Sequence, residues 1–185
     1  MQRVRPLLLV AALAFLLAPA QARADGYISP WVGPSWGSDV DNGRTAIGVS
    51  LGAVGTFVGA EVDLGFSPRF FGPVSDFGNN SVITAMGDLM IGAPIGNPEG
   101  KYIRPYAVGG IGLLRTQVEQ ANGTIFDTFS SNNDLGWNMG AGLMAYVSRH
   151  VGLRGDVRYV RSTDDHGSAG NNFHFWRMEF GLMFR

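Results

Sequence analysis

The C-terminal stretch 173–185, FHFWRMEFGLMFR, alternates between two kinds of side chain. One register, read in steps of two from His174, holds five large apolar residues among its six positions. The other register carries every formal charge of the stretch, on Arg177, Glu179 and Arg185. A period of two places successive side chains on opposite faces of a β-strand. The stretch therefore predicts a strand with one bulky apolar face and one charged face.

The same alternation recurs along the chain between connections rich in Gly, Pro and Asn. In the segment 56–67, for example, Val58 and Leu64 share one face while Glu61 and Asp63 share the other. We expect eight strands, at 27–36, 45–53, 56–67, 81–93, 102–115, 135–147, 151–161 and 173–185. The connections after the first, third, fifth and seventh strands are long and polar, and the others are short. Antiparallel up-and-down order places the long connections at one end of the sheet and the short ones at the other.

These features are typical of an outer-membrane barrel, which has an even number of strands with apolar-out, polar-in alternation. In hydrocarbon every backbone N–H and C=O needs a protein partner, so a membrane-spanning sheet must close on itself. The predicted fold is all-β, an eight-stranded antiparallel up-and-down transmembrane β-barrel. The alternative is a soluble lipocalin-like barrel or sandwich with its apolar face inside. Glycines on the charged face oppose that alternative, because small residues suit the narrow interior of an eight-stranded barrel.

Aromatic residues near the ends of the predicted strands also favour the membrane. They lie on the apolar face, as the interfacial girdles of membrane barrels do. The six residues of this predicted girdle are Trp36, Phe66, Trp137, Tyr159, Trp176 and Phe184.

Residues 1–24 have the features of a cleaved signal peptide. A basic start precedes the apolar run 7–18, which is shorter than the roughly 20 residues that a spanning helix needs. Small-x-small cleavage sites end at Ala22 and Ala24, and cleavage after Ala24 is preferred. The predicted barrel domain then covers 25–185. An uncleaved anchor is the alternative.

Charge and composition exclude several classes of function. The 185-residue chain has no Cys, which rules out disulfides and thiolate metal sites. Its formal net charge is -1, with no basic excess of the kind that marks a nucleic-acid-binding protein. His150 and His174 have no other ligands at metal-binding spacing, so we expect neither a metal site nor a cofactor.

Nine charged residues are predicted to point into the barrel. Desolvating a single charge costs several kcal/mol, so charges in a narrow bore need partners. The predicted luminal set is Glu61, Asp63, Asp88, Arg104, Arg154, Asp156, Arg158, Arg177 and Glu179. Five acids and four bases nearly balance, which favours an ion-pair network that plugs the lumen over an ion-conducting path. For the same reason Glu61 and Asp63 read as members of ion pairs rather than as a catalytic acid/base pair.

Several segments resemble the small eight-stranded outer-membrane β-barrel family, the OmpA/OmpX-like barrels of Gram-negative bacteria. They are the strand at 27–36, GWNMGAGL at 136–143, VGLRGDVRYVRS at 151–162 and FGLMFR at 180–185. The resemblance covers the whole mature chain. It implies an outer-membrane location, with membrane lipids, lipopolysaccharide and the barrel-insertion machinery as partners. Arg185 departs from the family pattern, because members often end on an aromatic residue.

The expected function is structural or surface-interacting, through long loops that face an extracellular ligand or surface, without catalytic residues. One alternative is a lipid A-modifying enzyme, because some barrels that resemble this chain are deacylases with a His-x-Ser pair. His166-Gly167-Ser168 has that spacing, but it lies in a polar loop that is poorly suited to hold a nucleophile and base in register. The matching strand position, 159–162, lacks the histidine. The other alternative is a small pore or transporter of apolar molecules.

Overall fold

The protein forms β-strands almost throughout the part of the chain that its computed structural model describes. The described residues are 24–37, 40, 43–70, 80–96, 101–118, 130–163 and 174–185. Their strands are β1 (Asp25–Trp36), β2 (Arg44–Val54), β3 (Val58–Pro68), β4 (Asn80–Gly92), β5 (Ile95–Gly96), β6 (Tyr102–Val118), β7 (Ser130–Tyr146), β8 (Val151–Ser162) and β9 (His174–Phe184). None of these residues belongs to a helix long and apolar enough to cross a membrane.

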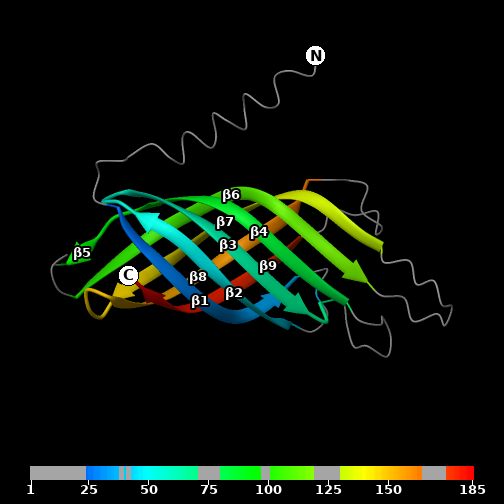
Figure 1. The fold of residues 1–185 in the computed structure, drawn as a ribbon, viewed down its shortest axis with the longest axis horizontal. Helices are drawn as coiled ribbons and strands as arrows, with labels where there is room; N and C mark the ends of the chain where they lie inside the picture. The colour runs from blue at the N-terminus through cyan, green and yellow to red at the C-terminus, as the bar shows by residue number, and fades with distance from the viewer. Residues whose placement is uncertain are drawn as a thin grey trace, which may run out of the picture.

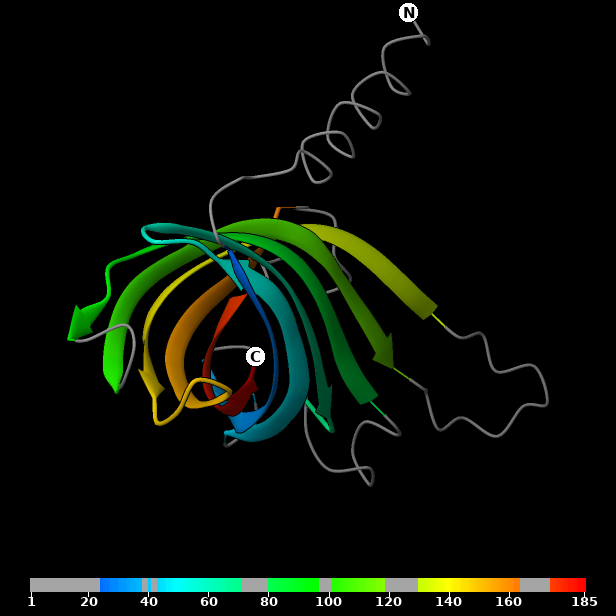
Figure 2. The ribbon, with the colours of Figure 1, turned by 60° about the vertical axis from the view of Figure 1, so that its left-hand side comes forward.

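Eight strands close into one antiparallel barrel (Figures 1 and 2). Sequential neighbours pair, except that β4 pairs with β6 and not with the short β5, and β1 pairs with β9 to complete the ring. The predicted eight-stranded up-and-down barrel is therefore confirmed. The short β5 was not predicted, because two residues inside a turn have no period; it pairs with β6 at the rim.

The two ends of the barrel differ, and we name them by their connections. At the loop end, the connections are 37–43, 69–79, 119–129 and 163–173, of which large parts lie outside the described residues. At the turn end, the connections are 55–57, 93–101 and 147–150. Asp25 and Arg185, at the ends of the first and last strands, also lie at the turn end. In outer-membrane barrels short turns face the periplasm and long loops face outward.

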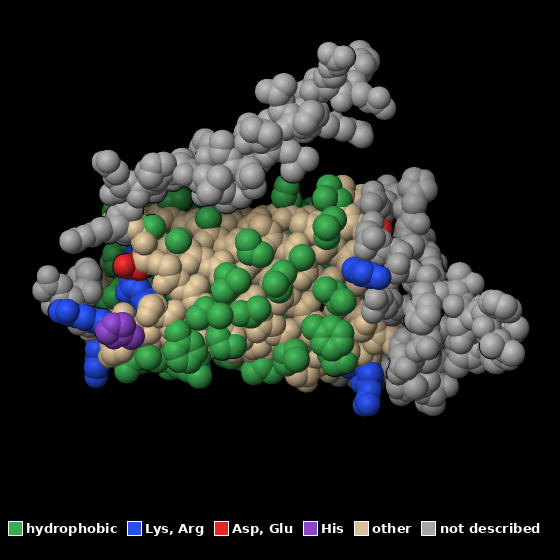
Figure 3. All heavy atoms as spheres, viewed as in Figure 1, with side chains coloured by type: hydrophobic (Ala, Val, Ile, Leu, Met, Phe, Trp, Pro, Cys, Tyr) green, Lys and Arg blue, Asp and Glu red, His purple; other side chains and the backbone are tan. Residues whose placement is uncertain are grey.

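The outer wall is apolar and the interior is charged. On β3, exposed and buried residues alternate along the whole strand, with Glu61 and Asp63 buried. On β9, Phe180 is 56% exposed, whereas Arg177 and Glu179 are each 1% exposed. Figure 3 shows hydrophobic side chains over the middle of the visible wall, with Lys and Arg near its two ends. The apolar face therefore points toward lipid, and the soluble alternative with its apolar face inside is wrong.

The interior has three layers along the barrel axis. A turn-end cluster consists of Tyr27, Val54, Met90, Tyr102, Tyr106, Val108, Met144, Tyr146 and Met183. A loop-end cluster consists of Val40, Phe70, Val82, Met86, Leu114, Val160 and Phe175. The charged side chains lie between them, as β4 illustrates: Asp88 sits between Met86 of the loop-end cluster and Met90 of the turn-end cluster. We call this middle part the ionic layer.

The seam between β1 and β9 is the least regular pairing of the barrel. Strand β1 pairs with β2 without a break, but its pairing with β9 skips positions 29–30 and 33–34. Each gap contains a proline, Pro30 or Pro34, and proline has no N–H to donate to a ladder. At Gly33 the strands approach so closely that a Cβ atom would lie 1.8 Å from the carbonyl oxygen of Met178. The two ends of the sheet thus meet across an interrupted hydrogen-bond ladder.

This interruption predicts uneven amide protection within β9. Successive N–H groups of a strand point to opposite neighbours, so alternate amides of β9 face β1 and β8. We expect the amides facing β1 to exchange with deuterium faster than those facing β8, because local opening is easiest where ladder bonds are missing. NMR of the refolded protein in micelles would measure both sets in one sample. Equal exchange rates along β9 would contradict a weakened seam.

Candidate functional site

The ionic layer brings together most of the charged residues predicted from the sequence. All nine are buried, and none is more than 7% exposed. They come from β3, β4, β6, β8 and β9, strands that lie on different sides of the ring. Because eight strands enclose only enough room for side chains, inward charges from opposite walls come within contact distance.

Arg158 is the hub of the layer. Its guanidinium lies 2.6 Å from Glu61, 2.6 Å from Asp88, 2.9 Å from Asp156 and 3.3 Å from Glu179. Its side chain is 0% exposed. A guanidinium has five N–H donors in a fixed fork, so one arginine can hold carboxylates from several directions. Arg158 thereby connects the β3, β4 and β9 walls to its own strand, β8.

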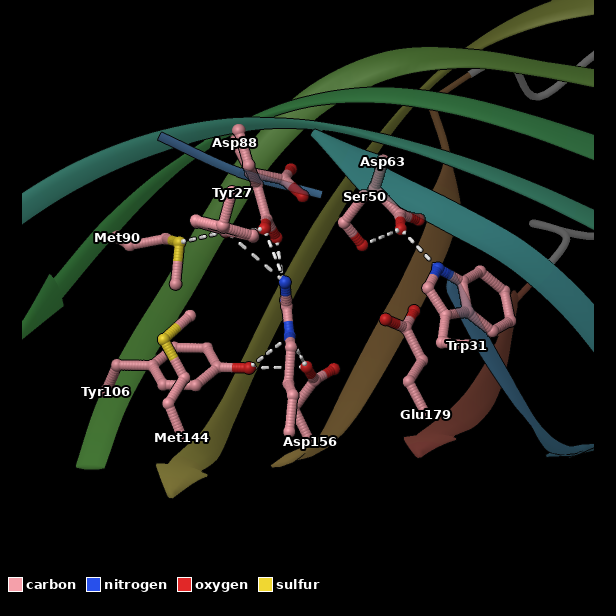
Figure 4. Close-up of polar contacts among 12 residues, drawn as sticks. Tyr27, Trp31, Ser50, Asp63, Asp88, Met90, Tyr106, Met144, Asp156 and Glu179 are labelled. Carbon is pink, nitrogen blue, oxygen red and sulfur yellow. Dashed lines mark hydrogen bonds and ion pairs between the residues drawn. The ribbon is translucent and has the colours of Figure 1, made fainter. Parts of the chain in front are cut away.

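Arg154 forms the second node, nearer the turn end. It binds both carboxylate oxygens of Glu61, at 2.6 and 2.8 Å, and its Nε lies 2.8 Å from Asp156. Two tyrosine hydroxyls complete this node: Tyr27 donates to Glu61, and Tyr106 donates to Asp156 at 2.5 Å. Figure 4 shows Tyr106 and Asp156 pointing toward one another. Bidentate Arg–carboxylate geometry is the strongest form of this pairing.

Arg177 forms the third node, nearer the loop end. Its Nη2 lies 2.5 Å from Asp63 and 2.6 Å from Glu179. Its Nη1 donates to the hydroxyl of Thr84 at 2.9 Å, and its guanidinium lies 4.5 Å from the centre of the Trp31 ring. The cation is thus held by carboxylates and by an aromatic face together.

Neutral side chains supply the remaining hydrogen bonds. Asp63 accepts bonds from Ser50 and from the indole N–H of Trp31, each at 2.9 Å (Figure 4). Asp88 accepts a bond from the amide of Asn138 at 2.8 Å. The predicted luminal set contained only charged residues, so these donors were missed. Their inward position on predicted strands was the available signal.

Arg104 differs from the prediction that it shares the luminal network. Its Nη1 donates to the carbonyl oxygen of Gly55, in the β2–β3 turn, at 2.6 Å. No carboxylate among the described residues pairs with it. Its register partner on β7 is Met144 of the turn-end cluster, so Arg104 lies too close to the barrel mouth to reach the acids. The connected network therefore has five carboxylates and three guanidiniums, and one oxygen of Glu179 has no hydrogen-bond partner.

The predicted aromatic girdle is concentrated at the loop end. Trp36, Phe66, Tyr159 and Trp176 lie toward that end of their strands, and Phe184 lies at the turn end. Trp137 is in the middle of the long β7, but its register partner is Arg161, near the loop end of β8. Phe57, which is 62% exposed at the turn end, was not predicted. The predicted strand 56–67 places it on the same face as Glu61 and Asp63, but β3 begins at Val58, so Phe57 lies in the β2–β3 turn and is free of that alternation.

Arg185 crosses the mouth of the turn end. Its guanidinium pairs with Asp25, donates to the hydroxyl of Tyr102 at 3.2 Å and lies 4.7 Å from the centre of the Tyr146 ring. Phe184, one position earlier, faces outward. The structure therefore has an outward-facing aromatic next to the end of the last strand, followed by an arginine that turns into the mouth.

The two residues considered for lipid A deacylation, His166 and Ser168, lie outside the described residues. The predicted signal peptide also lies outside them, apart from Ala24.

Comparisons with known proteins agree with this architecture. The model of the outer membrane protein beta-barrel domain matches residues 8–184. Among solved structures, the chain is similar to Neisserial surface protein A, with 14% identity, a TM-score of 0.64, and coverage of 87% of this chain and 97% of that chain. It is also similar to the N-terminal β-barrel domain of Pseudomonas aeruginosa OprF, with 15% identity, a TM-score of 0.53, and coverage of 88% and 98%.

A third similar structure is Ail, the attachment invasion locus protein of Yersinia pestis, in complex with the heparin analogue sucrose octasulfate. Its identity is 14%, its TM-score is 0.50, and coverage is 87% of this chain and 99% of that chain. At such identities the likeness shows the fold. No curated protein sequence matches the chain.

Because Arg158 is the hub, substitutions in the ionic layer are predicted to differ strongly in how much they lower the free energy of unfolding. Arg158→Met leaves buried Asp88 without a cation, and Glu61, Asp156 and Glu179 each keep only one arginine. We therefore expect a loss of about 3–5 kcal/mol in the free energy of unfolding. Glu179→Gln retains an acceptor for Arg177 and removes one charge from the acid excess. We therefore expect a change of only about 1 kcal/mol. Urea unfolding from lipid vesicles, followed by tryptophan fluorescence, measures both.

Arg104→Met is the matched control, because Arg104 is buried in the same bore but outside the network. Arg104→Met should lower the free energy of unfolding clearly less than Arg158→Met does. Equal losses for the two arginine variants would contradict the hub role.

Proposed function

Because the chain belongs to the outer membrane protein β-barrel domain family, we propose that it is a non-enzymatic outer-membrane protein with a plugged lumen. Its role in this proposal is structural and surface-interacting, carried by the loops of the loop end. The outer-membrane location follows from the family and from the fold it shares with other outer-membrane barrels.

The three-layered interior is the observation that carries the proposed plug. The side chains of Arg154, Arg158 and Arg177 are each no more than 1% exposed. Toward the outside, Phe70 meets Phe175 edge to face with ring centres 5.0 Å apart. Toward the periplasm, stacked tyrosine rings 4.3 Å apart belong to the turn-end cluster. A water file would have to separate two apolar clusters and break ion pairs in a site of low dielectric.

The same contacts support a role without catalysis. A catalytic acid or base must reach its substrate and have a pKa near the operating pH. Glu61 and Asp63 are both buried, and each is bound by arginine as well as by neutral donors. This arrangement is that of a structural ion pair.

The loop end offers a projecting surface for interaction. Strands β6 and β7 each have 17 residues, more than the other strands. The last β7–β8 pair is Gly136 with Ser162, whereas β7 begins at Ser130. Six residues of β-strand extend about 20 Å. At this end β7 runs past β8, while β6 stays paired with β4 as far as its last residue, Val118 (Figure 1).

A plugged lumen predicts no steady pore current. We expect purified protein in planar bilayers to give conductance indistinguishable from an empty bilayer, because the ionic layer and both apolar clusters fill the bore. Arg158→Met should raise the frequency of brief openings, since it removes the hub. Stable open channels in the unchanged protein would refute the plug.

A surface-interaction role predicts that binding depends on the projecting hairpin. Replacing 119–129 with an Asn-Gly turn joins β6 to β7 and keeps both strands. We expect closure to survive, seen as a gel-mobility difference between boiled and unboiled protein, while attachment falls about tenfold or more if hot-spot residues are lost. Attachment is measured to cultured cells and to immobilised heparin, a first probe because Ail was solved with a heparin analogue.

An equivalent replacement of the turn 147–150, at the opposite end, is the control and should leave attachment unchanged. If the unchanged protein attaches to no surface, or attaches equally well without 119–129, the proposed role of this hairpin is wrong. Lipid A mass from the same cells checks the non-enzymatic assignment, since loss of acyl chains that depends on Ser168 would overturn it.

A further inference from the structure

An aromatic platform lies on the lipid-facing wall at the loop end. It consists of Trp137, Tyr159 and Trp176, on the neighbouring strands β7, β8 and β9. The ring of Tyr159 is at its centre, 5.7 Å from the Trp137 ring and 5.1 Å from the Trp176 ring. Trp36 of β1 is the register partner of Trp176 and continues the row. Tryptophan and tyrosine have an apolar body and a polar edge, which suits the boundary between hydrocarbon and headgroups.

A row of basic side chains borders the platform on its outer side. Arg161 and His174 are register partners on β8 and β9, one outward position nearer the loop end than Tyr159 and Trp176. Trp137 is the register partner of Arg161 on the other side, and the His174 ring lies 5.9 Å from the Tyr159 ring. Strand alternation turns all of these side chains to the outer wall. Cation and aromatic groups therefore form one continuous surface.

An aliphatic surface borders the platform on its inner side. Met139 is the register partner of Tyr159, and Val157 is the register partner of Met178, all on the outward face. From the rim toward the middle of the membrane, the wall therefore presents a cation, then flat rings, then aliphatic groups. A phosphorylated glycolipid has the matching order of groups, which is phosphate, sugar ring and acyl chain.

We propose that this platform binds the phosphorylated sugar headgroup of an outer-leaflet glycolipid of the lipid A class. Arg161 binds the phosphate, because guanidinium geometry matches phosphate oxygens. The rings of Tyr159 and Trp176 pack against the sugar, and the aliphatic wall takes the acyl chains. The site lies on the outside of the barrel, so it is independent of the luminal plug and of attachment through the loops. It requires only that the loop end face the outer leaflet.

Arg115 provides a comparison within the same molecule. It is exposed, it faces outward near the loop end of β6, and its register partner on β4 is Ile83. Its neighbour two positions along β6 is Leu113, so this arginine is bordered by aliphatic side chains and not by an aromatic platform. An arginine at the membrane surface attracts any anionic lipid. Because only Arg161 borders the aromatic platform, we expect selectivity for a sugar phosphate at Arg161 and not at Arg115.

The test is a titration of lipid A into phosphatidylcholine vesicles that contain the folded protein. Tryptophan emission is a direct readout, because three of the four tryptophans, Trp36, Trp137 and Trp176, lie in this region. We expect saturable binding of diphosphoryl lipid A, and Arg161→Gln should raise the half-saturating mole fraction about fivefold. Arg115→Gln should change it by less than about twofold.

Two further lipids identify the chemistry that is recognised. Dephosphorylated lipid A lacks the group that Arg161 binds, and phosphatidylglycerol has a phosphate without a sugar ring, so both should bind more weakly. The proposal is overturned if either lipid binds as tightly as diphosphoryl lipid A, or if the two arginine variants weaken binding equally. A gel shift on boiling confirms that each variant is folded, and Tyr159→Leu, which leaves every charge in place, should also weaken binding.

Discussion

The narrowness of an eight-stranded ring determines most of what this protein can be. Side chains that point inward must fill a bore with no room for bulk water, so each charge placed there needs a partner on another wall. Arg158 meets that requirement for carboxylates on several strands at once. The ion pairs therefore act as crosslinks across the bore, in addition to the hydrogen bonds between neighbouring strands. Apolar clusters lie above and below the ionic layer, and electrostatic interactions are stronger in surroundings of low dielectric.

The direction of each side chain could be predicted from the sequence, but its contacts could not. Period-two alternation assigns Glu61, Asp88 and Arg158 to the inner face whatever the stagger of the strands. Which of them touch depends on the height of each residue along the axis, and that height is set by the pairing register of the closed ring. Arg104 shows the difference, because it shares the inward parity of the other arginines but lies level with the turn-end cluster.

The full lengths of β6 and β7 could not be predicted from the sequence. Alternation of apolar and polar residues is required only where a strand meets lipid. The ends of these strands, Thr116–Val118 and Ser130–Asn133, are polar in sequence except for Val118, and they continue the β6–β7 ladder beyond the last β7–β8 pair. Because alternation marks only the part of a strand that faces lipid, the predicted strands 102–115 and 135–147 were shorter than β6 and β7 at the loop end. The aromatic platform was recognisable as a girdle, but its union with Arg161 and His174 required the register of β7, β8 and β9.

The ion pair between Asp25 and Arg185 brings the first and last described residues of the barrel to one point on the rim. Because the first and last strands of the closed ring meet at this point, the chain could in principle begin at another strand. A short peptide across that point would allow the chain to be opened at another turn, as circular permutation does when termini are adjacent. Such a rearranged chain would move the chain ends away from the prolines of β1. It would therefore separate the effect of the prolines on the β1–β9 seam from the effect of the chain ends.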